Sequence, residues 1–159
     1  MKALIVYDSF FGNTEKVAQA IGTTVSEEGF VSVVKVGEVK PEHLTDLDLL
    51  ILGSPTRAFS PSPATKAFLK GLPAEALQGV KVAAFDTRIA LEDVHNKFLN
   101  FMVKLFGYAA KPMAKALQKK GGVLAIPPDW FFVKDSEGPL KDGELERAAA
   151  WAEKIAAAV

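Results

Sequence analysis

The feature that most constrains the fold is a regular alternation of short apolar runs with helical patterns. The first run, Lys2–Tyr7, shows almost no alternation of apolar and polar residues, and a helical pattern over Thr14–Glu28 follows it. Continuous apolar runs are typical of strands that are buried on both faces of a parallel sheet, because helices cover both sides. The alternation therefore predicts an α/β protein.

Five apolar runs are expected to form strands. They are Lys2–Tyr7, Val31–Val36, DLLILGSP, VKVAAFDT and GVLAIPP, with FFV at 131–133 continuing the last one after the two prolines. Helices are expected over Thr14–Glu28, Pro41–Leu44 (short), Pro63–Leu72, Glu92–Lys120 (broken near Gly107 and Pro112) and Glu144–Ala158. This order predicts a doubly wound five-stranded parallel sheet with helices on both faces and the strand order 2-1-3-4-5. No repeat or linker divides the chain, so residues 1–159 are expected to form a single domain.

Composition and charge exclude several classes of protein. Lys plus Arg and Asp plus Glu both total 19, so the net charge is zero, which argues against binding to nucleic acid or to an anionic membrane. Cysteine is absent, which excludes disulfides, thiolate metal ligands and cysteine nucleophiles. Met1 leads directly into a strand and no apolar run approaches membrane-spanning length, so we expect a cytoplasmic protein.

The segment between the first strand and the first helix suits an anion. Ser9, Asn13 and Thr14 offer side-chain donors at a helix N-terminus, and Gly12 allows a tight backbone turn. The loop has no Lys or Arg, which suits one terminal phosphate better than a triphosphate, and neither a Walker loop nor a Rossmann glycine pattern is present. The alternative is that the polar residues only cap the helix.

The sequence resembles the flavodoxin family at three strand ends. YDSFFGNTEKVAQAI is similar to the family signature Ser/Thr-x-x-Gly-x-Thr, which wraps the phosphate of FMN, and Ser9, Gly12 and Thr14 match it. LILGSPTRAFSPSPATKAFL is similar to the second flavin loop, and AAFDTR lies where the third belongs. The resemblance implies FMN as cofactor, held by Ser9, Phe10, Phe11, Gly12, Asn13, Thr14, Pro55, Thr56, Arg57, Ala58, Phe59, Asp86, Thr87 and Arg88.

The loops around the flavin ring depart from the family pattern. The second loop has Phe59 as its only aromatic residue and the third has none, so Trp130, or an aliphatic lid from Ile89 or Leu91, is a candidate replacement. For one of Phe10 and Phe11 we expect a core-facing position.

Arg57 and Arg88 are a second departure, because classical flavodoxins place acidic or neutral groups in these loops. If the two arginines face the ring, they raise the potential of the flavin. The alternative is that they point to solvent or pair with Asp86, Glu92 or Asp93.

The long segment before the fifth strand carries Val94, Phe98, Phe101, Met102 and Leu105 at helical spacing, which predicts a stripe packed on the sheet. In the alternative, one of its aromatic side chains overhangs the flavin edge or forms a dimer surface. The candidates for this role are Phe101, Phe106 and Tyr108.

The leading functional hypothesis is an FMN-binding electron-transfer protein that serves redox partner proteins or a small quinone-type acceptor. The first alternative is an NAD(P)H or quinone oxidoreductase of the WrbA type, usually an oligomer, so a homodimer stays open. The second is a binding module without flavin. A receiver domain of the chemotaxis type is excluded, because Asp8 stands alone and the third strand ends in Gly53-Ser54-Pro55 rather than in an acceptor aspartate.

Overall fold

The computed structural model describes the backbone of residues 1–159 and every side chain except that of Phe106. Five parallel strands form the centre: β1 (Lys2–Tyr7), β2 (Phe30–Lys35), β3 (Leu49–Pro55), β4 (Lys81–Ile89) and β5 (Val123–Leu124). Their order is β2-β1-β3-β4-β5, and a further strand, β6 (Asp129–Val133), also pairs with β4. The predicted fold class and strand order are confirmed.

The fifth position of the sheet is shared by two short strands. β5 pairs with the start of β4 at Lys81 and Val82, whereas β6 pairs with its end over Phe85–Ile89, and both are parallel to it. Pro127 and Pro128 lie between them. Proline donates no ladder hydrogen bond, so the interruption falls where the sequence predicts it.

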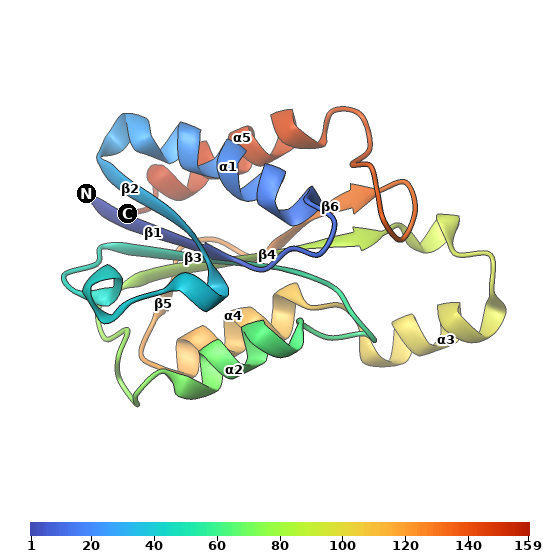
Figure 1. Ribbon diagram of the computed structural model, residues 1–159, viewed down its shortest axis with the longest axis horizontal. Coiled ribbons are helices and arrows are strands. Elements are labelled where there is room, and N and C mark those ends of the chain that lie inside the picture. Colours follow the sequence, from blue (N-terminus) through green and yellow to red (C-terminus); the bar gives the residue numbers. More distant parts are fainter.

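Helices cover both faces of the sheet (Figure 1). One layer contains α1 (Asn13–Val25) and α5 (Glu144–Ala156), and the other contains α2 (Pro63–Gly71) and α4 (Ala110–Lys119). Short 3₁₀ turns lie in several of the connections between strands and helices: η1 (Ser26–Glu28), η2 (Val36–Glu38), η3 (Pro41–Leu44) and η4 (Leu91–Asp93).

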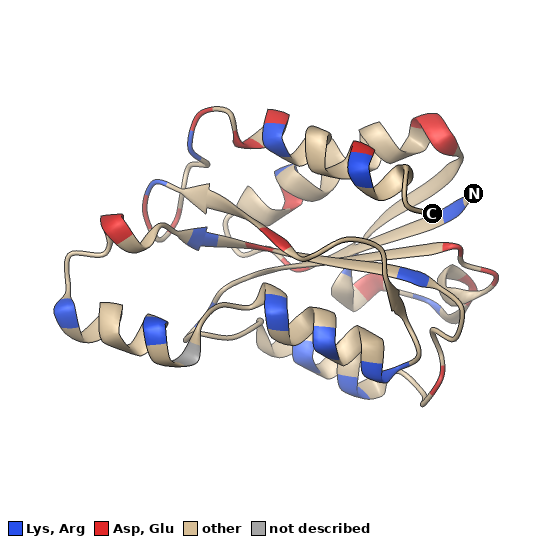
Figure 2. Ribbon diagram, turned by 180° about the vertical axis from the view of Figure 1, so that it is seen from behind, with Lys and Arg blue, Asp and Glu red and all other residues tan. Residues whose placement is uncertain are grey.

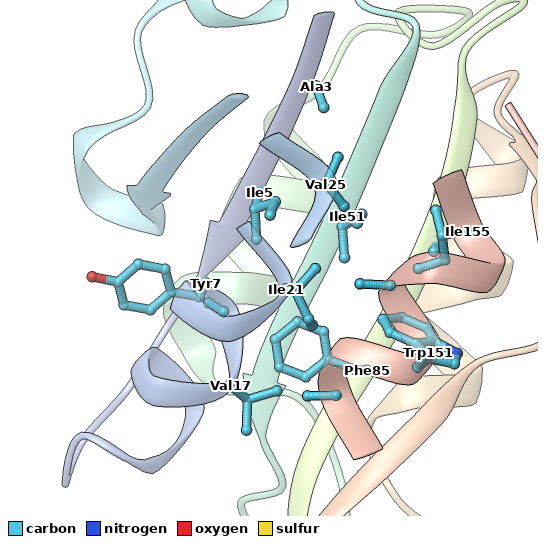
Figure 3. Packing of buried hydrophobic residues seen from close by; sticks show 14 of the residues in the cluster. Ala3, Ile5, Tyr7, Val17, Ile21, Val25, Ile51, Phe85, Trp151 and Ile155 are labelled. Atoms are coloured by element: carbon cyan, nitrogen blue, oxygen red, sulfur yellow. The ribbon is translucent and has the colours of Figure 1, made fainter. Parts of the chain in front are cut away.

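Alternate residues of each strand face opposite layers. Ile5 and Ile51 pack against Ile21 of α1, whereas their neighbours Leu4 and Leu50 belong to the core under α2 and α4. Figure 3 shows Phe85 and Trp151 in the first of these cores, close to Ile21 and Val17. Apolar side chains on both faces explain why the runs are continuous.

Three aromatic rings anchor the end of the sheet that leads into the loops. Phe85, Phe131 and Trp151 meet edge to face with centroids 5.9, 6.1 and 6.2 Å apart. Phe85 lies beside Gly53 on the neighbouring strand, where a Cβ atom would come within 2.1 Å of the ring. Glycine at position 53 therefore leaves the space that the Phe85 ring occupies.

The region between β4 and β5 differs from the prediction. It contains two helices, α3 (Lys97–Phe106) and α4, separated at Gly107, but Pro112 lies inside α4. Proline is tolerated there because the N–H groups of the first turn have no intrahelical partner.

The predicted stripe on the sheet is wrong for α3. Phe98, Phe101 and Leu105 are 67%, 60% and 62% exposed. Figure 1 shows α3 at one end of the molecule, away from the sheet.

Candidate functional site

The first loop curls so that the start of α1 stays uncapped. The Ser9 N–H donates to Asp8 Oδ1 at 2.9 Å, and the Gly12 N–H donates to Ser9 Oγ at 3.0 Å. Gly12 has φ 88°, in the left-handed region that favours glycine, and none of the described side chains caps the helix. The capping alternative is therefore wrong, and the N–H groups of the first turn remain available to an anion.

Thr14 joins the first loop to the third. Its Oγ1 lies 2.9 Å from Oγ1 of Thr87, and both residues are buried. One hydroxyl of the pair donates to the other, which leaves one hydroxyl hydrogen for a ligand. Asn13 has another partner, since its Nδ2 donates to the Glu137 carbonyl at 3.1 Å and holds the loop after β6.

The second loop makes a tight turn at its tip. Arg57 and Ser60 exchange two backbone hydrogen bonds of 2.8 and 3.0 Å, and between them Ala58 and Phe59 have φ angles of 46° and 66°. Left-handed backbone costs a residue with a Cβ about 1–2 kcal/mol. The turn is the position of most backbone strain among the three loops.

Arg57 and the two phenylalanines of the first loop form the outer rim. The Arg57 guanidinium lies 4.8 Å from the centroid of the Phe10 ring and 5.9 Å from that of Phe11. Both rings are about half exposed, at 50% and 48%. The expectation that one of them faces the core is wrong, because both rings are exposed and Arg57 stacks on the pair.

The third loop buries an ion pair. Asp86 is fully buried, and both of its oxygens accept hydrogen bonds from Arg88, from Nε at 2.7 Å and from Nη2 at 2.6 Å. The Arg88 guanidinium lies 3.7 Å from the Tyr108 centroid and 4.4 Å from that of Trp130. The pairing alternative is therefore confirmed for Arg88.

Burial dominates the electrostatics of this ion pair. It raises the pKa of the Asp86 carboxyl, although Arg88 and the Ala110 N–H, which donates at 2.8 Å, both act to lower it. Burial also raises the pKa of the Tyr108 phenol. Trp130 packs on Arg88 and lines neither of the two cavities described next.

The three loops enclose a cavity of about 130 Å³, which we call the loop cavity. Most of the predicted site residues line it, and sequence reasoning missed Val133 and Ser136. Its lining is Ser9, Phe10, Phe11, Asn13, Thr14, Pro55, Thr56, Arg57, Thr87, Arg88, Ile89, Val133 and Ser136. Gly12 and Asp86 do not line it; Gly12 shapes the first loop and Asp86 lies beneath the third.

A second cavity of about 380 Å³, the α3 cavity, adjoins the first. Thr56, Arg88 and Ile89 line both. Ala58 and Phe59 line only the second, together with residues from α3 and its flanks: Val94, Leu99, Val103 and Tyr108. Ile89 and Tyr108 are among the residues that the sequence singles out, whereas Leu99 and Val103 have no signal beyond helical spacing. Of the other candidates, Leu91 lines neither cavity, and the Phe106 side chain lies outside the described residues.

Comparison with known proteins identifies the class. The family model described as Flavodoxin matches residues 5–151. Flavodoxin 2 from Bacillus cereus is 22% identical, with a TM-score of 0.76 and 99% of each chain covered. A flavodoxin from the domain Archaea is 23% identical, with a TM-score of 0.74 and coverage of 99% of this chain and 97% of that one.

A WrbA-like protein from Agrobacterium tumefaciens has the same fold. It is 19% identical, with a TM-score of 0.69 and coverage of 98% of this chain and 95% of that one.

The chain belongs to the flavodoxin family, whose members bind FMN. It is a flavodoxin-type electron-transfer flavoprotein. In the part of the chain that the structure describes, no helix is long and apolar enough to cross a membrane.

Proposed function

We propose that FMN binds with its phosphate in the loop cavity and its ring toward the α3 cavity. The observation that carries this placement is the uncapped start of α1, which faces the hydroxyl groups of Ser9, Thr14 and Thr87 at the carboxyl edge of the sheet. The apolar lining of the second cavity, with Phe59 and Ile89, suits a flat heteroaromatic ring. The fourteen residues named from the sequence stay the proposed site, with Gly12 and Asp86 in supporting positions.

FMN supplies the redox chemistry when it is bound, and the protein sets binding, potential and access. Helix N–H groups and hydroxyls hold the phosphate dianion without a cationic side chain in the first loop. Phe10, Phe11 and Arg57 form the outer rim of the loop cavity. Electron transfer to a redox partner protein or to a quinone-type acceptor, within a single cytoplasmic domain, completes this proposal.

The cofactor released from the purified protein tests it. We expect a yellow protein that releases FMN and not FAD, because the site has one anion cradle and no second glycine-rich loop for an adenylate. Absorbance of the native protein and mass analysis of the released cofactor measure this. FAD as the native cofactor would contradict the single-phosphate argument, and a colourless protein that binds no added FMN would support the binding module without flavin.

A second candidate is the NAD(P)H or quinone oxidoreductase of the WrbA type. Arg57 favours it, because an exposed cation at the rim suits the phosphates of a nicotinamide nucleotide. Consumption of NADPH with a quinone acceptor distinguishes this oxidoreductase from an electron carrier. A homodimer is expected for the oxidoreductase and not for the carrier.

The two arginines are expected to act differently on the flavin potential. Arg88 is offset by Asp86, whereas no ion pair of Arg57 is found among the described side chains. A guanidinium about 6 Å from charge on the ring is worth roughly 3 kcal/mol at an effective dielectric near 20. For one electron this corresponds to a ceiling on the order of 100 mV, which solvent screening reduces.

Arg57→Gln should therefore lower the midpoint potential of the bound flavin by a few tens of mV, roughly 20–60 mV. Potentiometric titration of wild type and variant measures the shift, with Lys35→Gln on the outer strand as the control for loss of one positive charge. If both variants shift the potential equally, Arg57 does not act on the flavin at close range.

A further inference from the structure

Three large apolar side chains form an uncovered ridge on α3. Phe98, Phe101 and Leu105 are each at least 60% exposed, and their spacing places them on one side of the helix. We call these three residues the α3 crest. Exposed apolar patches of this kind mark interaction sites, because they gain free energy when a partner removes them from water.

The helices of the same layer are uniformly basic. α2, α3 and α4 contain no Asp or Glu, and none of their lysines forms an ion pair among the described side chains. The exposed lysines within these helices are Lys66, Lys70, Lys97, Lys104, Lys111, Lys115 and Lys119. In Figure 2 the charged residues marked on α2, α3 and α4 are blue, whereas α1 and α5 carry both signs. Although the net charge of the protein is zero, positive charge is thus concentrated on α2, α3 and α4.

The α3 crest lies next to the proposed flavin site. Leu99 and Val103, on the same helix, line the α3 cavity, and that cavity shares Thr56 and Arg88 with the loop cavity. A partner bound to the α3 crest would therefore be separated from the proposed flavin site by α3 itself.

We propose that the α3 crest and the lysines around it dock an acidic redox protein, whose apolar patch is surrounded by Asp and Glu. The proposal rests on the proposed function, because it places the partner against the wall of the FMN site. Charge complementarity accelerates encounter and sets orientation, and a small apolar contact suits a transient electron-transfer complex.

The charge distribution favours a protein over a bilayer or a second copy. Glu92, which is exposed, lies shortly before α3 in the chain, and a surface pocket in the same region contains both signs of charge: Asp93 is paired with Lys141 at 2.6 Å, and Asp135 lines the pocket with Lys134. A flat anionic membrane would meet the exposed acids Glu92 and Asp135 together with the lysines, whereas a shaped protein surface can avoid them. Two copies meeting through this layer would bring lysines against lysines, which opposes association.

The test compares two acceptor proteins of opposite charge. The FMN-loaded protein is photoreduced and mixed in stopped flow with acidic plastocyanin or with basic cytochrome c, and one electron passes from the flavin to the copper or the haem iron. With plastocyanin we expect a second-order rate constant that falls about tenfold or more between low and high salt. With cytochrome c we expect no fall.

Charge reversal locates the surface. Lys97→Glu with Lys104→Glu should lower the low-salt rate constant for plastocyanin by about tenfold or more, whereas Lys35→Glu with Lys154→Glu, an equal change of charge elsewhere, should change it by less than about threefold. Phe101→Ser should lower the rate at both salt concentrations. Equal effects of the two charge-reversed pairs, or a faster low-salt reaction with cytochrome c, would overturn the proposal.

Two measurements address the other occupants. Co-sedimentation with phosphatidylserine vesicles, or a sedimenting dimer that Phe101→Ser dissociates, would assign the α3 crest to a membrane or to a second copy and overturn the proposal. Re-oxidation by neutral benzoquinone needs no docking surface. If benzoquinone does not re-oxidise the reduced protein, the proposed function is wrong. If benzoquinone re-oxidises it but plastocyanin shows no preference over cytochrome c, the docking proposal alone is wrong.

Discussion

Arg88→Gln is expected to lower the free energy of unfolding by about 3–5 kcal/mol, because it leaves a buried carboxylate without its partner. Asp86 is fully buried, and Arg88 supplies two of the three hydrogen bonds found to its carboxyl, the third coming from the Ala110 N–H. The variant also loses the stacking of the guanidinium between Tyr108 and Trp130. Urea denaturation at pH 7 measures the change.

The control is an exposed ion pair of the same protein. Lys134 and Asp142 are 3.9 Å apart with side chains 52% and 101% exposed, so Lys134→Gln should cost less than about 1 kcal/mol. Asp86→Asn combined with Arg88→Gln should recover part of the loss, since the double variant buries no charge. If Arg88→Gln costs no more than Lys134→Gln, the buried ion pair does not stabilise the fold.

The pH dependence of Arg88→Gln has a definite sign. Burial already raises the pKa of Asp86 above the ordinary 3.8, and loss of Arg88 removes the strongest opposing effect. The native state then binds a proton that the unfolded state releases, so stability falls as pH rises from the ordinary value through the folded-state pKa. Measured against the double variant, the loss should therefore shrink as pH falls toward 4.

The sheet was predictable because each strand carries its own signal. Leu49–Leu52 is buried on both faces, and a buried parallel strand has no polar side to confuse the pattern. Ser9, Thr14 and Thr87 could be placed together for the same reason: each follows or ends a strand, and parallel strands end at one edge of the sheet.

The position of α3 could not be predicted from its sequence. An apolar stripe at helical spacing looks the same whether it covers a sheet or awaits a partner, since the pattern reports hydrophobicity and not what lies opposite. The sandwich of Arg88 between Tyr108 and Trp130 was equally hidden, because three separate segments meet there without any local signal. Asp86, two residues away, was one of three acidic partners that the sequence offered, and it is the one that Arg88 bonds.

The placement of the phosphate leads to the second large effect. Ser9→Ala with Thr14→Ala should weaken FMN about 100-fold or more, because two hydrogen bonds to a charged group contribute about 1.5 kcal/mol or more each. Ser9 Oγ already accepts from the Gly12 N–H, which leaves its hydroxyl hydrogen to donate, and Thr14 shares its hydroxyl with Thr87 next to the helix start.

Riboflavin distinguishes phosphate binding from general damage. It has the same ring and ribityl chain but no phosphate, so its affinity should change by less than about fivefold in the double variant. Thr24→Ala with Ser26→Ala removes one threonine and one serine hydroxyl at the other end of α1, where they bond only to helix carbonyls. This control should leave both ligands unaffected in a fluorescence titration. Equal losses of FMN and riboflavin in the Ser9 and Thr14 variant would place the phosphate elsewhere, since only a phosphate contact separates the two ligands.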